Sequence, residues 1–367
     1  MKNDHYFMKL ALDLASTAKG KTNPNPLVGA IIVKDGMIVG SGLHRKAGEP
    51  HAEVHAFHMA GDHAKGATLY VTLEPCSHFG KTPPCANLVK ESGVSRVVIA
   101  MKDPNPLVAG RGIKIIEDAG IEVEVGVLEQ EARRLNERFI HNMLTQMPFV
   151  ISKVAMTLDG KIAAYNGHSK WVSGEASRQK VHYLRNEVDA ILVGIGTVLA
   201  DDPMLTTRIP EGGKNPIRII IDSELRTPLD AKITDCTEAE TWIFTQEGVD
   251  EEKEAAFLAK GVQVYSAPKG EGLDLTFILK QLFELGITDV LVEGGGEVNS
   301  AFLREGLINK FQVYIAPKVL GGRHSLTPFT GKDVETMDDA VGLEFDSVEH
   351  IGDDLLITAY PKQQVES

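Results

Sequence analysis

The sequence predicts a two-domain α/β protein. Its 367 residues are about twice the usual length of a single domain. Hydrophobic residues make up 43% and charged residues 24%, a balance typical of folded globular proteins that excludes wholesale disorder. Short apolar runs alternate with helical stretches along the chain, as in sheets that helices cover on both faces. We place the domain boundary near Met147–Pro148, which divides the chain into residues 1–147 and 148–367.

The first domain begins with an amphipathic helix, Tyr6 to about Lys19, whose leucines and alanines recur at helical spacing. A turn-rich loop follows, and then two apolar runs that Asp35-Gly36 joins, a dipeptide typical of tight β-hairpins. The predicted elements after the first helix are hairpin strands at Val28–Val33 and Met37–Gly40, a helix from about His51, a strand at Thr68–Thr72, a helix after Pro84, a strand at Arg96–Met101 and a charged helix over Glu129–Met147.

The second domain repeats this alternation with more strands. The predicted strands are Phe149–Met156, Ala190–Gly194, Ile217–Ile221, Thr241–Phe244, Val262–Tyr265, Asp289–Val292 and Phe311–Ile315. Helical stretches separate several of them, so we expect helices to cover this sheet as well.

Charge and hydropathy exclude some classes of partner. The net charge is −13, so the mean electrostatic field repels polyanions and argues against a nucleic-acid binder. No apolar run approaches the ~18 residues that a membrane-spanning helix needs, and the first residues lack the apolar core of a signal peptide. We therefore expect a cytoplasmic protein with neither membrane nor nucleic-acid partners.

The three cysteines are unevenly placed. Cys76 and Cys85 lie close together beside several histidines, whereas Cys236 stands alone in a polar stretch and is expected to be a plain thiol. In a reducing compartment a close pair of cysteines is more often bound to a metal than joined as a disulfide.

The sharpest motif combines His51, Cys76 and Cys85. A catalytic zinc typically has three protein ligands and keeps a fourth position open for water. One imidazole and two thiolates would supply those three ligands. Bound zinc lowers the pKa of that water toward ~7. Glu53, two residues after the histidine, is the candidate for moving protons without binding the metal.

The spacing of this motif requires a particular geometry. Residues i and i+2 diverge on a regular helix, so His51 and Glu53 converge only if His51 stands at the very start of the helix, as Glu49-Pro50 before it indicates. Pro83-Pro84 similarly places Cys85 at a helix N-terminus, where the helix dipole favours a thiolate.

Two alternatives remain open for the motif. His51, His55 and His58 share one helical face, but the metalloprotease pattern requires Glu directly after the first His, where this chain has Ala52. A purely structural zinc would normally need a fourth protein ligand, and Cys236 is the remaining cysteine, far away in the second segment.

Together with Asn23 and Gly29-Ala30, these residues resemble the zinc-dependent cytidine-deaminase superfamily. The superfamily signature has two residues between the cysteines, whereas here residues 77–84 separate them. The string EPCSHFGKTPPC is instead similar to the deaminase half of the bifunctional riboflavin-biosynthesis enzymes, which act on a phosphoribosylaminopyrimidine. That resemblance implies substrate contacts at Asn23, His44, His78 and Lys81, each of which could otherwise be an ordinary surface residue.

Two glycine-containing strings follow strands of the second domain, Val193–Thr197 and Glu293–Asn299. Neither gives the spacing of a dinucleotide-binding fingerprint, so from the residues alone both could be plain strand-to-helix turns. Glycines before a helix nevertheless let a pyrophosphate approach backbone amides at the positive end of the helix.

The second domain as a whole resembles the reductase half of the same family, in the strings MTLDGKIA, SKWVS and GTVLADDP and in the loop Gly294–Gly296. That half uses NADPH. The resemblance implies cofactor contacts at Ala155, Trp171, Thr197, Asp201, Ser223, Gly295, Gly296, Glu297, Val298, Asn299, Ser300 and Ala301. It implies substrate contacts at Lys153, Ser169, Arg185, Leu205, Arg208 and Glu293.

The resemblance spans nearly the whole chain in the same domain order. It implies a cytidine-deaminase-like three-layer α/β/α domain, followed by a dihydrofolate-reductase-like α/β domain. The implied reactions are zinc-dependent hydrolytic deamination of 2,5-diamino-6-(5-phosphoribosylamino)pyrimidin-4(3H)-one and then NADPH-dependent reduction of its ribosyl side chain to ribityl. Lys153 and Asp201 are candidate proton donors for the reduction, and Arg226 is a candidate partner for the 2′-phosphate of NADPH.

Two rival functions come from other classes. A tRNA deaminase with a C-terminal binding module would need a basic stripe, which the acidic composition disfavours. A non-catalytic zinc-stabilised scaffold would be expected to lack Glu53 or the open metal position. A homo-oligomer is compatible with the sequence, which does not define one.

Overall fold

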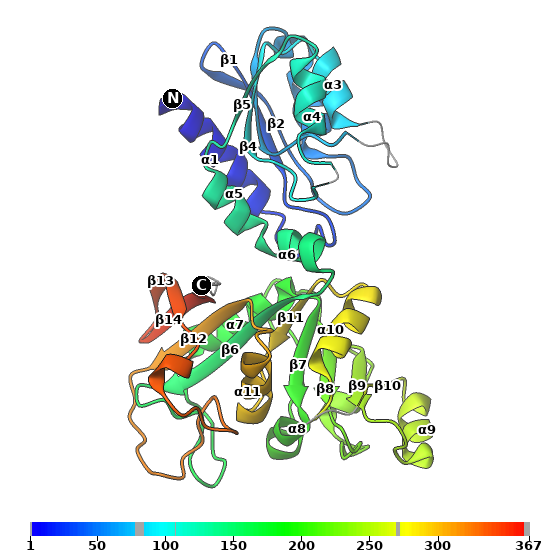
Figure 1. The fold of residues 1–367 in the computed structure, drawn as a ribbon, viewed down its shortest axis with the longest axis vertical. Coiled ribbons are helices and arrows are strands. Elements are labelled where there is room, and N and C mark those ends of the chain that lie inside the picture. Colours follow the sequence, from blue (N-terminus) through cyan, green and yellow to red (C-terminus); the bar gives the residue numbers. More distant parts are fainter. Residues whose placement is uncertain (1, 78–83, 107, 269–271, 363–367) are drawn as a thin grey trace. The chain divides into compact units, whose positions relative to one another are not determined.

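We describe the protein from a computed structural model, which covers residues 2–77, 84–106, 108–268 and 272–362. The chain divides into two compact units, Met1–Gln146 and Met147–Ser367, which Figure 1 colours from blue to red along the sequence. Among the described residues, no helix is both long enough and apolar enough to cross a bilayer.

The first unit contains five strands and six α-helices within its described residues, together with a short 3-10 helix. In chain order they are α1 (Lys2–Ser16), β1 (Gly29–Lys34), β2 (Met37–Leu43), α2 (Ala52–Ala60), the 3-10 helix η1 (Gly61–Ala64), β3 (Thr68–Leu73), α3 (Cys85–Glu91), β4 (Arg96–Met101), α4 (Arg111–Glu117), β5 (Glu122–Val125), α5 (Glu129–Leu135) and α6 (Glu137–Thr145).

The five strands form one sheet in the order β2-β1-β3-β4-β5. The predicted hairpin is confirmed, since β1 and β2 pair antiparallel around Asp35 and Gly36, which both have positive φ values of 51° and 78°. Two successive residues at positive φ are what a tight hairpin turn requires. The strands β3, β4 and β5 then pair in parallel, so their carboxyl ends share one edge of the sheet.

Helices cover both faces of this sheet (Figure 1). The alternating residues of β1 show how: Ala30 and Ile32 pack with α2, α3 and α4, whereas Ile31 and Val33 pack with α1 and α5. Because successive side chains of a strand point to opposite faces, each side of the sheet has its own apolar core. The predicted three-layer α/β/α arrangement is confirmed.

The charged stretch Glu129–Met147 does not form the single helix that the sequence predicts. It is divided at Asn136, whose φ of −105° and ψ of 21° depart from helical values, into α5 and α6. The buried Asn136 side chain bonds to the backbone of Leu27, a tertiary contact that competes with a straight helix. The short elements α4 and β5 were also not predicted.

The second unit contains nine strands within its described residues. In chain order its elements are β6 (Phe149–Thr157), α7 (Glu175–Glu187), β7 (Ala190–Gly194), α8 (Ile195–Asp201), β8 (Ile217–Ile221), η2 (Lys232–Thr234), β9 (Thr241–Thr245), α9 (Glu251–Ala259), β10 (Gln263–Ser266), α10 (Leu275–Glu284), β11 (Asp289–Val292), α11 (Gly296–Arg304), β12 (Lys310–Ala316), η3 (Met337–Asp339), β13 (Leu343–Ile351) and β14 (Asp354–Pro361).

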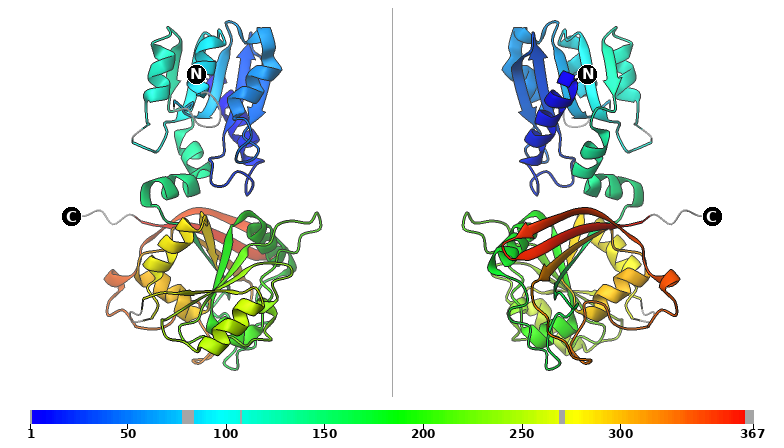
Figure 2. Two further views of the ribbon diagram at one scale, coloured as in Figure 1. Left: turned by 90° about the vertical axis from the view of Figure 1, so that its right-hand side faces the viewer. Right: turned by 90° about the vertical axis from the view of Figure 1, so that its left-hand side faces the viewer.

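These strands form one sheet in the order β10-β9-β8-β7-β11-β6-β12-β14-β13. The seven strands from β10 to β12 pair in parallel, whereas β14 and β13 form an antiparallel hairpin that extends the sheet beyond β12 (Figure 2, red). The seven parallel strands match the predicted ones within one residue at most ends. The hairpin β13–β14 was not predicted.

The centre of the nine-stranded sheet holds a topological switch point. The neighbouring strands β7 and β11 are parallel, yet the helices that follow them lie on opposite faces of the sheet: Val198 of α8 packs in one core, and Phe302 of α11 packs in the other. Helices that diverge in this way open a crevice outside the carboxyl ends of the two strands, where ligands bind in open α/β sheets.

Candidate active sites

The first candidate site is a cluster of potential metal ligands in the first unit. The His51, Cys76 and Cys85 ligand atoms all lie within 4.8 Å of one another. The Nδ1 atom of His51 is 3.2 Å from the Cys85 Sγ and 3.6 Å from the Cys76 Sγ. Three ligand atoms at such distances surround a position that a single ion could occupy.

The ends of two helices build this cluster. His51 is the N-cap of α2, with extended backbone angles of −71° and 165°, and Cys85 is the first residue of α3 after the N-cap Pro84. The backbone amide of Cys85 donates a hydrogen bond to the Cys76 Sγ at 3.3 Å. Because His51 precedes the helix rather than belonging to it, its side chain and that of Glu53 can line the same cavity.

The chemistry of these donors fits a zinc ion. The pKa of Cys76 is lowered to about 4, chiefly because the Cys85 thiol donates a hydrogen bond to it, whereas the same bond, burial and Glu53 raise the pKa of Cys85. The two thiols therefore do not both ionise readily without added positive charge. A divalent cation supplies that charge, and an imidazole with two thiolates is a ligand set that zinc prefers.

Glu53 lies beside the cluster and is 3% exposed. Burial is the main cause that raises the pKa of its carboxyl group above the usual value. The side chain lines the same cavity as His51 and Cys76. It is therefore held next to the ligand cluster in a water-poor environment, as a group that gains and loses a proton during a reaction would be.

The cavity beside the cluster has a volume of about 370 Å³. His44 lines it and is buried, with its Nε2 atom 3.0 Å from the Asn25 side-chain nitrogen and its Nδ1 atom 3.3 Å from the Pro50 carbonyl oxygen. Of the two nearby asparagines, the described lining includes Asn25 rather than the expected Asn23. His78 and Lys81, the other two expected contacts, lie outside the described residues.

The two further histidines of α2 do not join the cluster. His58 is exposed, and His55 is partly buried with its Nε2 atom lacking a hydrogen-bond partner among the described residues. The lowered pKa of His55, which results mainly from desolvation, favours its neutral form.

Several lining residues of the cavity were not singled out from the sequence. Among them, Glu74 is fixed by four hydrogen bonds. Its carboxylate accepts them from the backbone amides of Asp103, Gly110, Gly112 and Ile113. The position of Glu74, a glutamate directly after an apolar strand and directly before Pro75-Cys76, is the sequence signal that could have identified it. The others are Pro26, Val28, Leu73, Asp103, Asn105, Val108, Phe139 and Met143.

The second candidate site surrounds a buried ion cluster in the second unit. The Glu293 carboxylate, just after β11, accepts two hydrogen bonds from Arg185 of α7, at 2.8 and 3.0 Å, and lies 2.9 Å from the Lys153 Nζ of β6. Burial opposes the ionisation of Glu293, but Arg185 and Lys153 outweigh it and lower its pKa below the usual value. The three predicted substrate residues are thus brought together as a charged triad.

Arg185, one of the expected substrate contacts, makes its hydrogen bonds within the protein. Besides its two bonds to Glu293, it donates one to the Thr206 carbonyl oxygen at 3.2 Å. Arg208, in contrast, is exposed, and its guanidinium lies 3.4 Å from the His182 Nε2. Desolvation first, and then the nearby Arg185 and Arg208, lower the pKa of His182 to about 4, so this ring is neutral beside the two arginines.

The glycine loop after β11 opens at the switch point. Gly295 is the N-cap of α11, and a Cβ there would lie 3.4 Å from the Thr197 Oγ1 of α8. A Cβ on Gly194 or Gly294 would lie within 3.0 Å of the Val298 side chain. These glycines let α11 begin close to β7, with its first backbone amides at the crevice, which fits the phosphate groups of a dinucleotide.

Not all the expected cofactor residues present their side chains to this crevice. The Asn299 amide donates to the Gly294 and Pro328 carbonyl oxygens, and the Ser300 hydroxyl accepts from the Thr330 amide, so both side chains are held within the protein. Trp171, in contrast, is 63% exposed, with the Arg178 guanidinium 4.7 Å from its ring centroid. The remaining expected residues are Ala155 on β6, Asp201 at the end of α8, and Glu297, Val298 and Ala301 on α11. Ser169 and Leu205 lie in the loops that follow β6 and α8.

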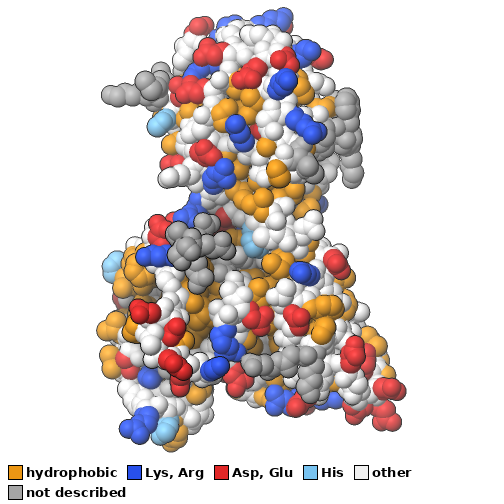
Figure 3. All heavy atoms as spheres, in the orientation of Figure 1, with side chains coloured by type: hydrophobic (Ala, Val, Ile, Leu, Met, Phe, Trp, Pro, Cys, Tyr) orange, Lys and Arg blue, Asp and Glu red, His pale blue; other side chains and the backbone are white. Residues whose placement is uncertain are grey.

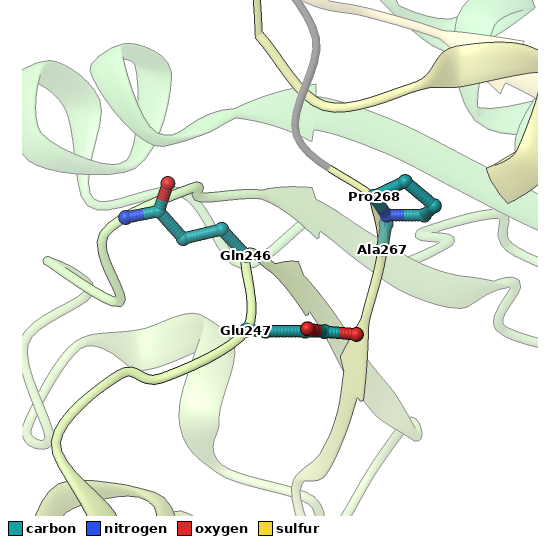
Figure 4. Close-up of a pocket in the computed structure, with 4 residues that line it drawn as sticks. All are labelled: Gln246, Glu247, Ala267 and Pro268. Carbon is teal, nitrogen blue, oxygen red and sulfur yellow. The ribbon is translucent and has the colours of Figure 1, made fainter.

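Ser223 adjoins a further cavity at the same edge of the sheet. Its carbonyl oxygen accepts bonds from the Gln246 amide and the Thr245 hydroxyl, both at 3.1 Å. Beyond the ends of β9 and β10, Gln246, Glu247, Ala267 and Pro268 line a cavity of about 400 Å³ (Figure 4). Arg226 is exposed, with its Nε atom 3.8 Å from the Glu224 carboxylate.

Comparisons with known proteins match two stretches of the chain to different families. Residues 1–101 match the family of the cytidine and deoxycytidylate deaminase zinc-binding region, and residues 148–357 match the RibD C-terminal domain. The riboflavin biosynthesis protein RibD of Aquifex aeolicus is 48% identical over 96% of this chain and 97% of its own, and that of Bacillus amyloliquefaciens is 46% identical over 98% and 96%. The chain belongs to the RibD family.

Solved structures of RibD proteins share the whole arrangement. Acinetobacter baumannii RibD superposes with a TM-score of 0.87 at 41% identity, covering 99% of both chains. A Thermotoga maritima protein described as a diaminohydroxyphosphoribosylaminopyrimidine deaminase and 5-amino-6-(5-phosphoribosylamino)uracil reductase gives a TM-score of 0.85 at 39% identity, covering 98% of this chain and 99% of its own.

Membership in the RibD family confirms the predicted fold class and function. The protein is a bifunctional enzyme of riboflavin biosynthesis that carries out a deamination and a reduction. Zinc for the deaminase and NADPH for the reductase are confirmed as its cofactors, and the tRNA-deaminase alternative is not favoured.

Proposed function

We propose that the chain first deaminates 2,5-diamino-6-(5-phosphoribosylamino)pyrimidin-4(3H)-one and then reduces the ribosyl side chain of the product to ribityl. We assign deamination to residues 1–147 and reduction to residues 148–367. The observation that carries this proposal is the pairing of a His-Cys-Cys cluster next to a buried glutamate with a buried charged triad at a switch point, one in each unit.

We assign the deaminase chemistry to four residues. His51, Cys76 and Cys85 would hold zinc, which supplies Lewis-acid activation of a water molecule. Glu53 takes the first proton from that water and passes it to a ring nitrogen of the pyrimidine. It then takes the second proton, from the hydroxyl group now on the ring carbon, and passes it to the departing amine as the carbonyl forms. His44 and Asn25, which contact each other at the cavity wall, orient the base. Asn23, His78 and Lys81 remain candidate contacts beyond this described wall.

We assign the reductase chemistry to the crevice between β7 and β11. When bound, NADPH would supply the hydride for ribose C1′, and the first amides of α11 with Gly295, Gly296 and Thr197 would hold its phosphates. The cavity beside Ser223 lies at the same sheet edge and would take the far end of the cofactor. Lys153, which is ion-paired with Glu293, is the proposed proton donor to the opening ribose ring.

Arg208 is the proposed contact to the 5′-phosphate. It is an exposed arginine beside the neutral His182, and an arginine–phosphate bond is charge-assisted. The substrate is thus a small phosphorylated pyrimidine. We expect no nucleic-acid partner, since basic and acidic side chains are interspersed on the face drawn in Figure 3. We also infer a cytoplasmic location, consistent with three free cysteines.

The test uses purified full-length protein and the diaminopyrimidine phosphate, with mass analysis of the products. Without NADPH we expect a gain of about 1 Da, because an amino group is replaced by oxygen, together with ammonia release. With NADPH, a further gain of about 2 Da should follow. Reduction of the undeaminated compound at the same rate would contradict the order of the two steps.

A further inference from the structure

We propose that Asn136, which no part of the zinc motif includes, is a positioning residue for the deaminase. It shapes two walls of the substrate cavity at once. The inference rests on the proposed deaminase function, and it concerns how the cavity is closed around the pyrimidine rather than how the metal is held. Asn136 is 2% exposed and occupies the single residue between α5 and α6.

The Asn136 side chain pairs with the backbone of Leu27 as a neighbouring strand would. Its Oδ1 atom accepts from the Leu27 amide at 2.8 Å, and its Nδ2 atom donates to the Leu27 carbonyl oxygen at 3.0 Å. Both hydrogen-bonding groups of one residue in the loop are thus satisfied by a single side chain from 109 residues away. A loop that is fixed in this manner has little freedom to move, so the residues on either side of Leu27 are held in place as well.

The neighbours of Leu27 are the first wall of the cavity. Pro26 and Val28 line it on either side of the paired residue, and Asn25 lines it while contacting His44. The Val28 carbonyl oxygen also accepts from the His44 amide at 2.9 Å. A displacement of Leu27 would therefore reach both Asn25 and His44, the two residues that we assign to the base.

The second wall is α6, which begins directly after Asn136. The Asn136 carbonyl oxygen accepts the first bond of that helix, from the Ile140 amide at 2.9 Å. Phe139 and Met143 line the cavity, and their spacing of four residues places them on one face of α6. The change of direction at Asn136 sets which face that is, since a straight continuation of α5 would aim these side chains elsewhere.

The combination requires a side-chain carboxamide. Its acceptor and donor lie side by side and match the amide and carbonyl of a single residue, and asparagine supplies this group on a short side chain. An aspartate at this position would present an oxygen to the Leu27 carbonyl oxygen, and an alanine would leave both groups of Leu27 without this partner. Neither change touches His51, Cys76, Cys85 or Glu53.

The experiment compares Asn136→Ala and Asn136→Asp with the matched control Gln130→Ala, which removes an exposed amide from α5. Full-length proteins are assayed for zinc content, ammonia release from the diaminopyrimidine phosphate, and reduction of the already deaminated intermediate. Both Asn136 variants should keep full zinc and normal reduction while kcat/KM for deamination falls about ten- to hundredfold, mainly through KM, since small misplacements cost rates of this order. The control should match wild type.

A purely structural role gives a different pattern. If Asn136 only stabilised the fold, zinc content and maximal rate would fall together while the KM of the remaining active molecules stayed unchanged, and the proposal would be overturned. An unchanged KM at full zinc content would overturn it as well. Asn136→Asp, which keeps the size of the side chain, provides this comparison even if Asn136→Ala does not fold.

A double variant tests the route of the effect. If Asn136 acts through the α6 wall, then Asn136→Asp and Phe139→Ala should be less than additive in their effects on KM. Full additivity would contradict the α6 part of the proposal. Wild type that releases no ammonia from this substrate would refute the proposed function itself, a result that is visible before any variant is compared.

Discussion

The two active sites of this chain are built in opposite ways. The deaminase cluster comes from two helix N-termini and the loop after β3, within residues 51–85. The reductase residues, in contrast, are spread from β6 to α11 and meet only because parallel strands share an edge. The described lining of the deaminase cavity contains no lysine or arginine. The reductase crevice, in contrast, places Lys153 and Arg185 on a single glutamate.

This difference in charge matches the part of the substrate that each reaction changes. The deaminase alters a neutral ring, and its described cavity offers amide, imidazole and apolar side chains that suit a heterocycle. The reductase alters the sugar, next to the fixed phosphate, and its crevice provides cationic groups. The deaminase can therefore bind the substrate by its base, and the reductase can bind the deaminated product by its sugar phosphate.

Glu53→Gln is expected to give the largest difference between its effects on deamination and on reduction. Removing the proton carrier while keeping its shape should lower deamination by about 10²- to 10⁴-fold, with full zinc content and normal reduction of the deaminated intermediate. Ammonia release, zinc analysis and NADPH oxidation measure the three quantities. Glu49→Gln, an exposed glutamate four residues earlier, is the matched control. Loss of the reduction as well would show that the sites are not independent.

Glu293→Gln should destabilise the reductase unit by about 3–5 kcal/mol at pH 7, because it leaves the buried Arg185 and partly buried Lys153 without a counter-charge. Both tryptophans, Trp171 and Trp242, lie in this unit, so urea unfolding followed by tryptophan fluorescence reports on it alone. The exposed Glu284→Gln is the control. A decrease of less than about 1 kcal/mol in the free energy of unfolding would mean that the triad does not stabilise this unit.

The same glutamate gives a pH dependence with a defined sign. Its pKa is lowered in the folded state, so the stability that it contributes is fully present above the unfolded pKa of about 4.3. That stability is lost as the pH falls from there through the folded pKa. Wild type should therefore lose more stability than Glu293→Gln between pH 5 and the acid limit of the measurement. Parallel curves for the two proteins would contradict an ionised Glu293.

Zinc binding should depend on the cysteines of the deaminase cluster and not on Cys236. Cys85→Ser removes a direct ligand and should lower zinc affinity by about 100-fold or more. Even the loss of a residue that only hydrogen-bonds to a metal ligand typically lowers metal affinity by about 10- to 100-fold. Cys236→Ser lies in the other unit and should retain one zinc per chain. Metal analysis after dialysis against a weak chelator compares them. Equal zinc in both variants would refute the ligand assignment.

The sequence was sufficient to predict those features that depend on residues close together in the chain. The helix start at His51 followed from Pro50, and the central strands followed from buried apolar runs such as Ile217–Ile221. The division of the helix at Asn136 could not be predicted, because Leu27 and Asn136 are distant in sequence and nothing local marks their contact. The four amides that converge on Glu74 are hidden for the same reason.

Weak patterning explains the other misses. No residue of the edge strand β13 is fully buried, so the strand shows little of the apolar alternation that marks a strand. The residues Lys153, Arg185 and Glu293 carried no local signal of mutual contact and were brought together by a resemblance. The bidentate bond between Arg185 and Glu293 makes Arg185 a poorer candidate than Arg208 for binding phosphate, since a buried carboxylate already satisfies its guanidinium.

The smallest effect is expected at the outer rim of the reductase site, and it separates two arginines that the sequence treated alike. Arg208→Met should raise KM for the phosphorylated substrate about tenfold with a smaller change in kcat, because a remote ionic contact acts similarly in the ground and transition states. Arg185→Met should instead destabilise the unit, since it strips Glu293 of its principal partner. On the dephosphorylated substrate, Arg208→Met and wild type should perform equally poorly, because the group that Arg208 binds is gone. If Arg208→Met were still about tenfold worse on that compound, Arg208 would act on the ribose or the base, and the phosphate would have to be held by a different group of the crevice.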